Sequence, residues 1–366
     1  MRHLNTWALC SLKVTLPAGL LLFAAGPPAS RAATIYSVQS LAALGPGIAQ
    51  PSAINSSGTA VGYMTTSNGS LSAVTFANGQ TTTLGTDAIA VGVNDSGLVV
   101  GASYRGIDLS VAEWANGKLT TLDIPGYATS VNNAGQVAGG YITPARELHA
   151  FVWNHGVLND LGTLGGGWSS AYGVNSSGQV TGTSLTNSFT FDAFFDNGKG
   201  MSDLGTLGGR NSYGMAINNS GMVVGNSQTG SGQTHGFAWN GSGMTDLGTL
   251  GGSQSYAFGV NNTSTIVGSS FITGNQAEHG FVFANGVITD LNALLPLDSG
   301  WVIDAAYAIN NAGDILAEGT LHDQLYAVEL APGAPGGGEV APEPSTLLFA
   351  GLGLLGLGAW SRRFIR

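Results

Sequence analysis

The chain has 366 residues, of which 43% are hydrophobic, 9% are charged and 58 are glycine. So few charges with so much apolar content exclude a disordered polyelectrolyte, and glycines without a three-residue period exclude a collagen. Residues 33–341 carry five basic and 20 acidic side chains, an imbalance that repels nucleic acid and anionic lipid and excludes both as partners of this stretch.

Residues 1–32 have the layout of a secretory signal peptide. Arg2 and Lys13 supply its positive charge, an apolar run follows, and Ser30-Arg31-Ala32 forms a small-x-small cleavage site. We expect cleavage after Ala32. The single cysteine, Cys10, lies inside this segment. The mature protein is therefore expected to have no disulfide, thiolate metal site or cysteine nucleophile.

From residue 33 onward, a turn of the form Asn-x-x-Gly returns every 38 to 49 residues. The asparagine side chain can bond the backbone of its own turn, and the glycine takes the left-handed conformation. Ser264 replaces this glycine in the sixth copy. The seven asparagines are Asn55, Asn94, Asn132, Asn175, Asn218, Asn261 and Asn310. Seven copies at this period predict a repeat architecture.

A second hairpin completes each unit, with β-branched and aromatic residues around an Asn-Gly or similar turn, as in HAFVWNHGVLNDLG from His149. Four short strands in about 43 residues match the size of a propeller blade. We therefore predict an all-β fold, a seven-bladed β-propeller over residues 33–330. The lone first strand at residues 34–41 is expected to pair with the last strand, LYAVELAP, and close the ring. A β-solenoid is the alternative.

The sequence DLGTLGG occurs at residues 160–166, 203–209 and 246–252. Asp-Leu is predicted to end a blade, and GTLGG to form a flexible crossing whose leucine enters the core between blades. Because a catalytic group is needed once per site, acids that recur with the repeat are interpreted as turn-bonding groups. They are Asp160, Asp203, Asp246 and Asp290.

Histidines are the candidates for metal binding. His149, His235 and His279 occupy equivalent strand positions and could hold zinc only if they converge, whereas the phenylalanines beside them favour packing. We expect neither a metal nor another cofactor. No zinc-protease, nucleophile-elbow, P-loop or EF-hand motif occurs, and a GxGxxG at residues 351–356 follows no βαβ unit.

Acids that do not recur are the candidates for catalysis. Asp298 and Asp304 flank Trp301, and Asp314 and Glu318 follow them in the sequence. A glycosidase would need two such carboxyl groups about 5 to 9.5 Å apart. The alternative is that these four are solvated loop acids.

Tryptophans divide into two groups by their position in the repeat. Trp114, Trp153 and Trp239 share one repeat position and are expected in the core. Trp168 and Trp301 lie in predicted crossings between blades, where exposed rings could stack on sugars. A binding role is therefore compatible with the sequence but not located by it.

The C-terminus begins with a Pro/Gly-rich linker at residues 331–341, followed by Pro342-Glu343-Pro344, an apolar segment at 346–360 and a basic end. We predict a hydrophobic helix over 346–360, with Trp360, Arg362, Arg363 and Arg366 as its interfacial and cytoplasmic anchors. Residues 342–366 closely resemble the PEP-CTERM sorting signal of Gram-negative bacteria. This resemblance implies processing near Pro342-Glu343-Pro344 by an exosortase, in bacteria that make an exopolysaccharide matrix.

The body of the chain resembles the bacterial extracellular HAF-repeat proteins, on the basis of the His149-Ala150-Phe151 triplet followed by DLGTLGG. The first two units lack both features, and other units read DAF or HGF. The family has no established biochemical activity, so the resemblance implies an extracellular repeat protein without indicating a mechanism. The signal peptide and the tail predict export through the inner membrane to the cell surface or beyond, with transient membrane anchoring by the tail. We expect a non-catalytic surface or matrix protein that binds exopolysaccharide or another surface protein. A secreted polysaccharide-active enzyme, a glycosidase or lyase using one face of the propeller, is the alternative.

Overall fold

A computed structural model describes residues 36–43, 49–66, 69–77, 79–106 and 108–333. They belong to the second of two compact units, which begins at Thr34. The predicted signal peptide with Ala32, the sorting signal and the helix at 346–360 with its basic end lie outside the described residues. Within them, no helix has the length and apolar character needed to cross a membrane.

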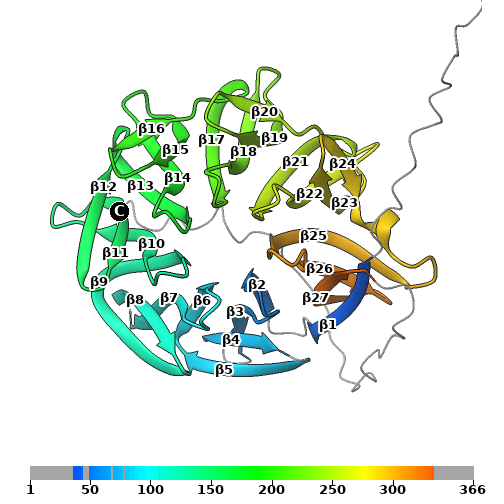
Figure 1. Cartoon of the computed structure of the whole chain (residues 1–366), viewed down its shortest axis with the longest axis horizontal. Coiled ribbons are helices and arrows are strands. Elements are labelled where there is room, and N and C mark those ends of the chain that lie inside the picture. The colour runs from blue at the N-terminus through cyan, green and yellow to red at the C-terminus, as the bar shows by residue number, and fades with distance from the viewer. Residues whose placement is uncertain (1–35, 44–48, 67–68, 78, 107, 334–366) are drawn as a thin grey trace, which may run out of the picture. The chain divides into compact units, whose positions relative to one another are not determined.

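The fold is an all-β propeller, whose sheets surround a central axis (Figure 1). Four sheets are separate four-stranded antiparallel blades. The first contains β2 (Ala49–Ile54), β3 (Ala60–Thr65), β4 (Leu71–Ala77) and β5 (Gln80–Thr86). The second contains β17 (Gly208–Ile217), β18 (Val223–Thr229), β19 (Thr234–Trp239) and β20 (Met244–Asp246). The third contains β21 (Gly251–Val260), β22 (Ile266–Ile272), β23 (Glu278–Ala284) and β24 (Val287–Asp290).

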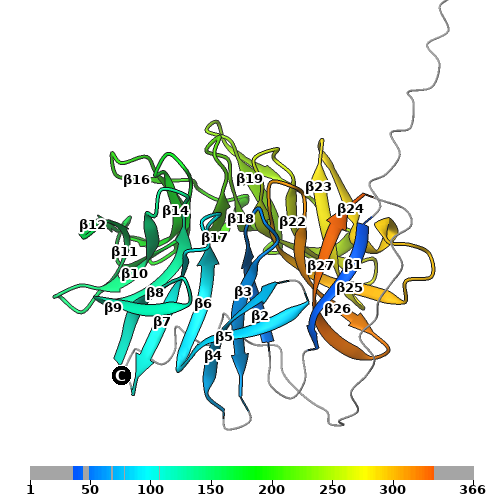
Figure 2. The same cartoon turned by 60° about the horizontal axis from the view of Figure 1, so that its bottom comes forward.

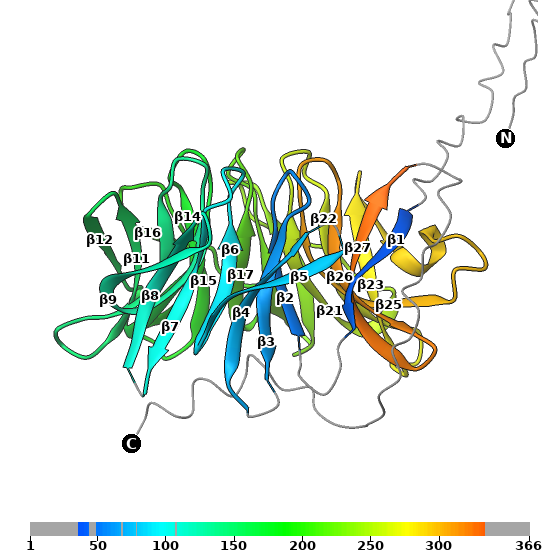
Figure 3. The same cartoon turned by 90° about the horizontal axis from the view of Figure 1, so that it is seen from below.

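The fourth blade joins the two ends of the described chain. It contains β25 (Trp301–Ile309), β26 (Ile315–Leu321), β27 (Gln324–Pro332) and β1 (Tyr36–Ala43), and the 3-10 helix η1 (Leu291–Leu294) precedes it. β1 pairs with β27 from Tyr36↔Pro332 to Ala43↔Tyr326 (Figure 3). The predicted pairing of the first and last strands is confirmed, although β27 extends two residues into the predicted linker.

The remaining units form one 11-stranded sheet. Its strands are β6 (Ala88–Val93), β7 (Val99–Arg105), β8 (Asp108–Ala115), β9 (Lys118–Val131), β10 (Val137–Ile142), β11 (Leu148–Asn154), β12 (Val157–Gly162), β13 (Gly165–Val174), β14 (Val180–Thr186), β15 (Phe191–Asp196) and β16 (Met201–Asp203). The 14-residue β9 pairs with both β8 and β10, and one parallel pair, Leu148↔Trp168, joins β11 to β13. Seven separate blades are therefore not confirmed, whereas the β-solenoid alternative is wrong.

The core lies between neighbouring sheets, which stand around the axis like the blades of a wheel (Figure 2). One cluster, for example, packs Val224 from β18 against Ala257, Ile266 and Phe281 from the next sheet. The phenylalanines beside the three histidines, Phe151, Phe237 and Phe281, are fully buried, as predicted. Each such ring contributes about 2 to 3 kcal/mol by leaving water.

The DLGTLGG segment joins one unit to the next, and its leucines Leu164, Leu207 and Leu250 pack into the clusters between sheets, as predicted. Hydrogen bonds within the crossing close it as a turn. Thr163 Oγ1 donates a hydrogen bond to Gly166 O and accepts one from Gly165 N at 3.2 Å, and the other two copies repeat both bonds. Threonine therefore closes a turn of the same kind in all three copies.

Candidate functional site

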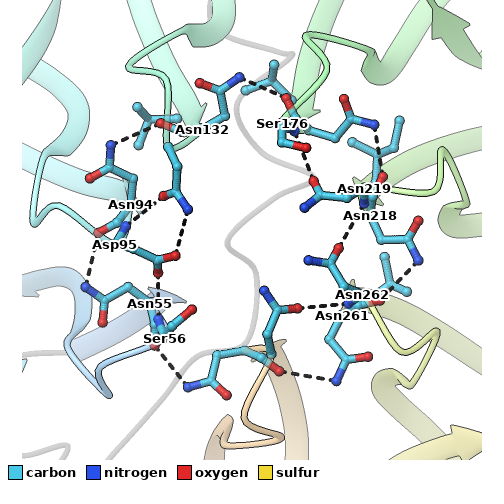
Figure 4. Close-up of a pocket in the computed structure, with 18 of the residues that line it drawn as sticks. Asn55, Ser56, Asn94, Asp95, Asn132, Ser176, Asn218, Asn219, Asn261 and Asn262 are labelled. Atoms are coloured by element: carbon cyan, nitrogen blue, oxygen red, sulfur yellow. Dashed lines mark hydrogen bonds between the residues drawn. The ribbon is translucent and has the colours of Figure 1, made fainter.

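A cavity of about 240 Å³ lies on the axis of the propeller, where the first strand of each unit turns into the second. Each unit supplies three consecutive residues to its wall: a valine or isoleucine that ends the first strand, the recurrent asparagine and the residue that follows it. Figure 4 shows these side chains around an open centre. We call this cavity the axial pocket.

The recurrent asparagines form a closed hydrogen-bonded circle around the axial pocket. Asn218 is typical: its Oδ1 accepts the backbone N–H groups of Ser220 and Met222 at 3.1 and 3.0 Å, and its Nδ2 donates to Asn261 O of the next unit at 3.1 Å. All seven asparagines donate in this way, and Asn310 completes the circle by donating to Asn55 O. These buried amides hold the units together and are not free to bind a ligand.

The turn glycines behave as the sequence predicts. The residue three positions after each asparagine is left-handed in all seven turns, and Ser264 adopts φ 63° in place of glycine. The conformation is therefore required by the turn even where the residue does not favour it.

The residues that follow the asparagines form the exposed rim of the axial pocket. Backbone N–H groups of one unit donate to side-chain oxygens of the next, as from Ser56 to Asp95 and from Asn219 to Asn262, both at 2.9 Å. Asp95 is the one carboxylate that lines the pocket. The Ser56 N–H, helped by the Asn133 amide, holds the pKa of Asp95 below its usual value. The rim thus offers amides, hydroxyls and one stable anion, which suit polar binding rather than nucleophilic chemistry.

The four acids that the sequence singled out do not form one group. Asp298 is exposed in the loop after η1, and Asp314 accepts a hydrogen bond from Asn310 at the axial pocket. Asp304 and Glu318 lie on β25 and β26, where they influence each other electrostatically. The structure therefore brings together two of the four.

Asp304 and Glu318 belong to a half-buried group of acids and hydroxyls. Asp304 Oδ2 accepts from Thr320 Oγ1, and Glu318 Oε2 accepts from Tyr307 OH, both at 2.8 Å. Burial raises the pKa of both carboxyls, and the nearby charge of Glu278 adds to both shifts. Two acids with raised pKa values beside a tyrosine are a possible acid–base pair.

Tyrosines on the first strands were missed by the sequence analysis. Tyr127, Tyr172, Tyr213, Tyr256 and Tyr307 lie on β9, β13, β17, β21 and β25, the strands whose last residues line the axial pocket. They are linked across units: Tyr127 OH donates to Ser170 Oγ at 3.1 Å, and Phe258 packs against both Tyr256 and Tyr307. Burial raises the pKa of Tyr172 and Tyr307, so both stay protonated hydrogen-bond donors. Each tyrosine precedes a recurrent asparagine by three or five residues. This regular spacing is the feature of the sequence from which the row of tyrosines could have been predicted.

The tryptophans partly follow expectation. Trp114 is fully buried, and Trp153 and Trp239 are half-buried against hydrophobic clusters. Trp168 and Trp301 are not in crossings, because β13 and β25 include them. Both are half-buried, Trp301 edge-on to Tyr326 at 5.2 Å and Trp168 edge-on to Phe191 at 5.4 Å between ring centroids.

The histidines do not converge. Each Nδ1 bonds an aspartate of the same sheet: His149 with Asp160, His235 with Asp246, and His279 with Asp290, at 2.7 to 2.9 Å. In the described part of the chain, no three histidine or carboxylate side chains lie where they could share a metal ion. Asp160, Asp203 and Asp246 also accept the N–H of the glycine two residues on, and Asp290 caps η1, so the turn-bonding interpretation is confirmed.

The fourth unit replaces this histidine with Asp192, which faces Asp203. Asp192 is 9% exposed, and its Oδ1 is buried without a hydrogen-bond partner. Burial, followed by the charge of Asp203, raises the pKa of Asp192 from 3.8 to about 6. Because this folded pKa lies above the unfolded one, ionised Asp192 lowers stability above about pH 6, and the penalty disappears as the pH falls toward 4.

We expect Asp192→Asn and Asp192→His to raise the free energy of unfolding at pH 7.5 by about 1 kcal/mol, after allowance for solvent screening on the Asp203 side. At pH 4 the Asn variant should match the parent, because Asp192 is then protonated. Urea unfolding at both pH values measures this. Asp246→Asn is the matched control and should destabilise, since it removes the carboxylate from His235. Equal gains at both pH values would contradict the explanation.

A second cavity, of about 460 Å³, lies where β10 ends and the β10–β11 loop (residues 143–147) begins. Pro125, Ile142, Pro144 and Leu158 give it an apolar wall, and Tyr141 borders it. Tyr141 OH donates to Asp160 at 2.9 Å, and burial together with this carboxylate raises its pKa to about 12. The loop itself is mostly polar, so the sequence gives no sign of an apolar cavity here. The apolar wall forms because β9 contributes Ile124 and Pro125 from a distant part of the sequence.

Comparisons with known proteins identify the tail and the fold. Residues 340–363 match the PEP-CTERM protein-sorting motif, which supports a C-terminal exosortase sorting signal. No curated protein matches the sequence. A puromycin-hydrolyzing peptidase of Mycobacterium tuberculosis is similar in structure, with 11% identity and a TM-score of 0.56 over 82% of this chain and 53% of that one.

Two propeller domains are similar at lower scores. The WD40 β-propeller of Doa1 has 14% identity and a TM-score of 0.44, covering 81% of this chain and 97% of that one. The β-propeller domain of the Trilobed protease from Pyrococcus furiosus has 10% identity and a TM-score of 0.38, covering 66% and 97%. This chain spans about half the length of the peptidase that it resembles. At such identities the likeness shows the fold alone: the chain is a β-propeller with a PEP-CTERM sorting motif.

Proposed function

We propose that this protein is a non-catalytic cell-surface or matrix protein of a Gram-negative bacterium, related to the HAF-repeat proteins, that binds exopolysaccharide through its propeller. The sorting motif at residues 340–363 indicates export, surface or extracellular location and processing by an exosortase. Cleavage near Pro342-Glu343-Pro344 would release the propeller after transient membrane anchoring by the helix predicted at 346–360 and its basic end.

We infer that the propeller has seven blades. The circle of seven asparagine bonds supports this number, because each bond joins one unit to the next and the last returns to the first. Within the 11-stranded sheet, β9 serves two neighbouring units because its two halves pair with different strands. The continuous sheet is then three blades joined at β9 and at the short β11–β13 contact.

The observation that carries the binding function is the row of tyrosines on the first strands. Tyrosine offers a flat apolar ring and a hydroxyl, and within this row Tyr213 is 38% exposed. Sugar rings present apolar faces and hydroxyl edges, so the same combination of groups recognises them. The 20 acids against five basic residues in residues 33–341 disfavour a strongly anionic polymer.

A polysaccharide-active enzyme is the second candidate, because Asp304 and Glu318 are half-buried acids whose pKa values are raised. In that case the row of tyrosines would hold the polysaccharide substrate beside these two acids. Both acids are hydrogen-bonded to neighbouring hydroxyls, which equally explains them as parts of the sheet.

We expect the exported protein to co-sediment with exopolysaccharide from its own host without generating reducing ends. Asp304→Asn and Glu318→Gln should leave this binding unchanged, because the non-catalytic proposal needs no acid–base pair. The assay follows co-sedimentation and reducing ends in the same tubes. New reducing ends that disappear in either variant would replace the binding function with a hydrolase, and absence of co-sedimentation would reject binding of this polymer.

A further inference from the structure

The β14–β15 loop contains an exposed aromatic residue in a disfavoured conformation. Thr186 N donates to Thr190 O at 2.9 Å, and Phe189 N donates to Thr186 O at 3.1 Å, closing a tight loop. Phe189 has φ 56° and is 76% exposed. Bulky residues seldom adopt this left-handed conformation, and an exposed phenylalanine gains nothing from the core.

Corresponding loops show what the position normally requires. The loops from Thr66 and Thr229 have the same pair of backbone hydrogen bonds and place Gly69 and Gly232 at the left-handed position. The loop from Thr143 places Arg146 there. Phenylalanine at this position therefore lowers the stability of the fold relative to glycine. Because the ring is exposed, burial of apolar surface does not offset this loss. Strain of this kind is a reason to look for a binding role.

Three further aromatic rings, beginning with Phe191 two residues after Phe189, lie near one another across two units. Phe191, at the start of β15, contacts Trp168 of β13 edge-on at 5.4 Å and lies stacked near Tyr213 of β17 at 6.2 Å with an interplanar angle of 24°. The Phe191 N–H donates to Asn211 Oδ1 at 3.0 Å, which fixes the strand edge. Tyr213 is 38% exposed. We call Trp168, Phe189, Phe191 and Tyr213 the aromatic ledge.

We propose that the aromatic ledge binds a neutral glycan chain with flat pyranose rings, in an extension of the proposed function on which this inference rests. The apolar C–H faces of such rings pack on aromatic faces, and rings held by their neighbours lose little entropy on binding. Arg210 and Tyr213 are both exposed on β17 and supply hydrogen-bond donors to hydroxyl groups. The excess of acidic residues in residues 33–341 selects a neutral chain over an anionic one.

Phe189→Gly tests the ledge without endangering the fold. Glycine relieves the left-handed strain, so the Tm should stay equal or rise, while affinity for the host exopolysaccharide and for cellohexaose, a neutral β-1,4-glucan, should fall about tenfold. Arg146→Gly is the matched control: it relieves the same strain in the neighbouring loop and should leave both affinities unchanged. Tyr213→Ser copies Ser170, which precedes its asparagine by the same five residues, and should also weaken binding about tenfold.

Affinities are measured on the exported full chain by titration calorimetry, with Tm recorded for each variant. Host exopolysaccharide bound equally by the parent and by both ledge variants would overturn the ledge and leave the proposed function standing. No binding of either glycan by the parent would overturn both. Weakened binding in Arg146→Gly equal to that in Phe189→Gly would also overturn the ledge, because it would make the effect a general one of loop change.

Discussion

Replacing Asn218 by alanine should lower the free energy of unfolding by about 3 kcal/mol, because the buried side chain loses three hydrogen bonds to backbone groups and a fourth from the Ser220 hydroxyl. Asn218 is 3% exposed, and its amide satisfies two backbone N–H groups of its own turn and the carbonyl of Asn261. Alanine leaves these three groups without a partner. Water from the axial pocket replaces some of the loss, which keeps the effect below the sum of three buried bonds. Urea unfolding of the full chain measures it.

Asn219→Ala is the matched control for this prediction. Asn219 is the next residue, is exposed, and accepts a single hydrogen bond, from Ser176 N at 3.0 Å. We expect its loss to cost about 0.5 kcal/mol, since water reaches the freed N–H. If the two variants unfold at the same urea concentration, the circle of asparagines does not hold the units together as argued above.

Deleting residues 36–43 should have the largest effect. β1 forms a ladder with β27, and its Tyr36 and Leu41 side chains are buried in two different clusters between sheets. The deletion exposes the edge of β27 and empties both positions, so we expect a loss of about 5 kcal/mol or more, comparable to the total stability of many domains. The deletion variant should melt well below the parental temperature, and light scattering should show aggregation through the open edge.

Ser37→Ala is the control for the deletion, because Ser37 is exposed on β1 and its hydroxyl makes one weak contact of 3.4 Å with Ala331 O. It should unfold like the parent. A deletion variant that melts at the parental temperature would show that the other sheets keep the ring together without β1.

Much of the fold could be predicted because its signals lie within a few residues of each other. An asparagine that bonds the backbone two and four residues on, and a left-handed residue before the second strand, are local requirements that recur with the repeat. The same is true of Asp160, which accepts the N–H of Gly162. Such turns specify where strands begin and end without reference to the rest of the chain.

The candidate site was not predictable in the same way. Asp298, Asp304, Asp314 and Glu318 are neighbours in sequence, which makes them one group of candidates. Strand pairing keeps Asp304 and Glu318 close and separates the other two acids from them. β25 runs from Trp301 to Ile309 and β26 returns, which keeps Asp304 near Glu318 but carries Asp314 to the turn at the other end. Register and strand direction, rather than spacing, select the neighbours of an acid.

The turns and the repeat follow from local backbone chemistry, and the pairing of the first strand with the last follows from the need to leave no sheet edge open, so all three can be predicted from the sequence. Other contacts are visible only in the folded protein: Phe191 stacks near Tyr213, Asp192 faces Asp203, and the asparagines close a circle. Those contacts join different strands or different units. They depend on how the sheets pack around the axis, and no short stretch of sequence specifies that geometry.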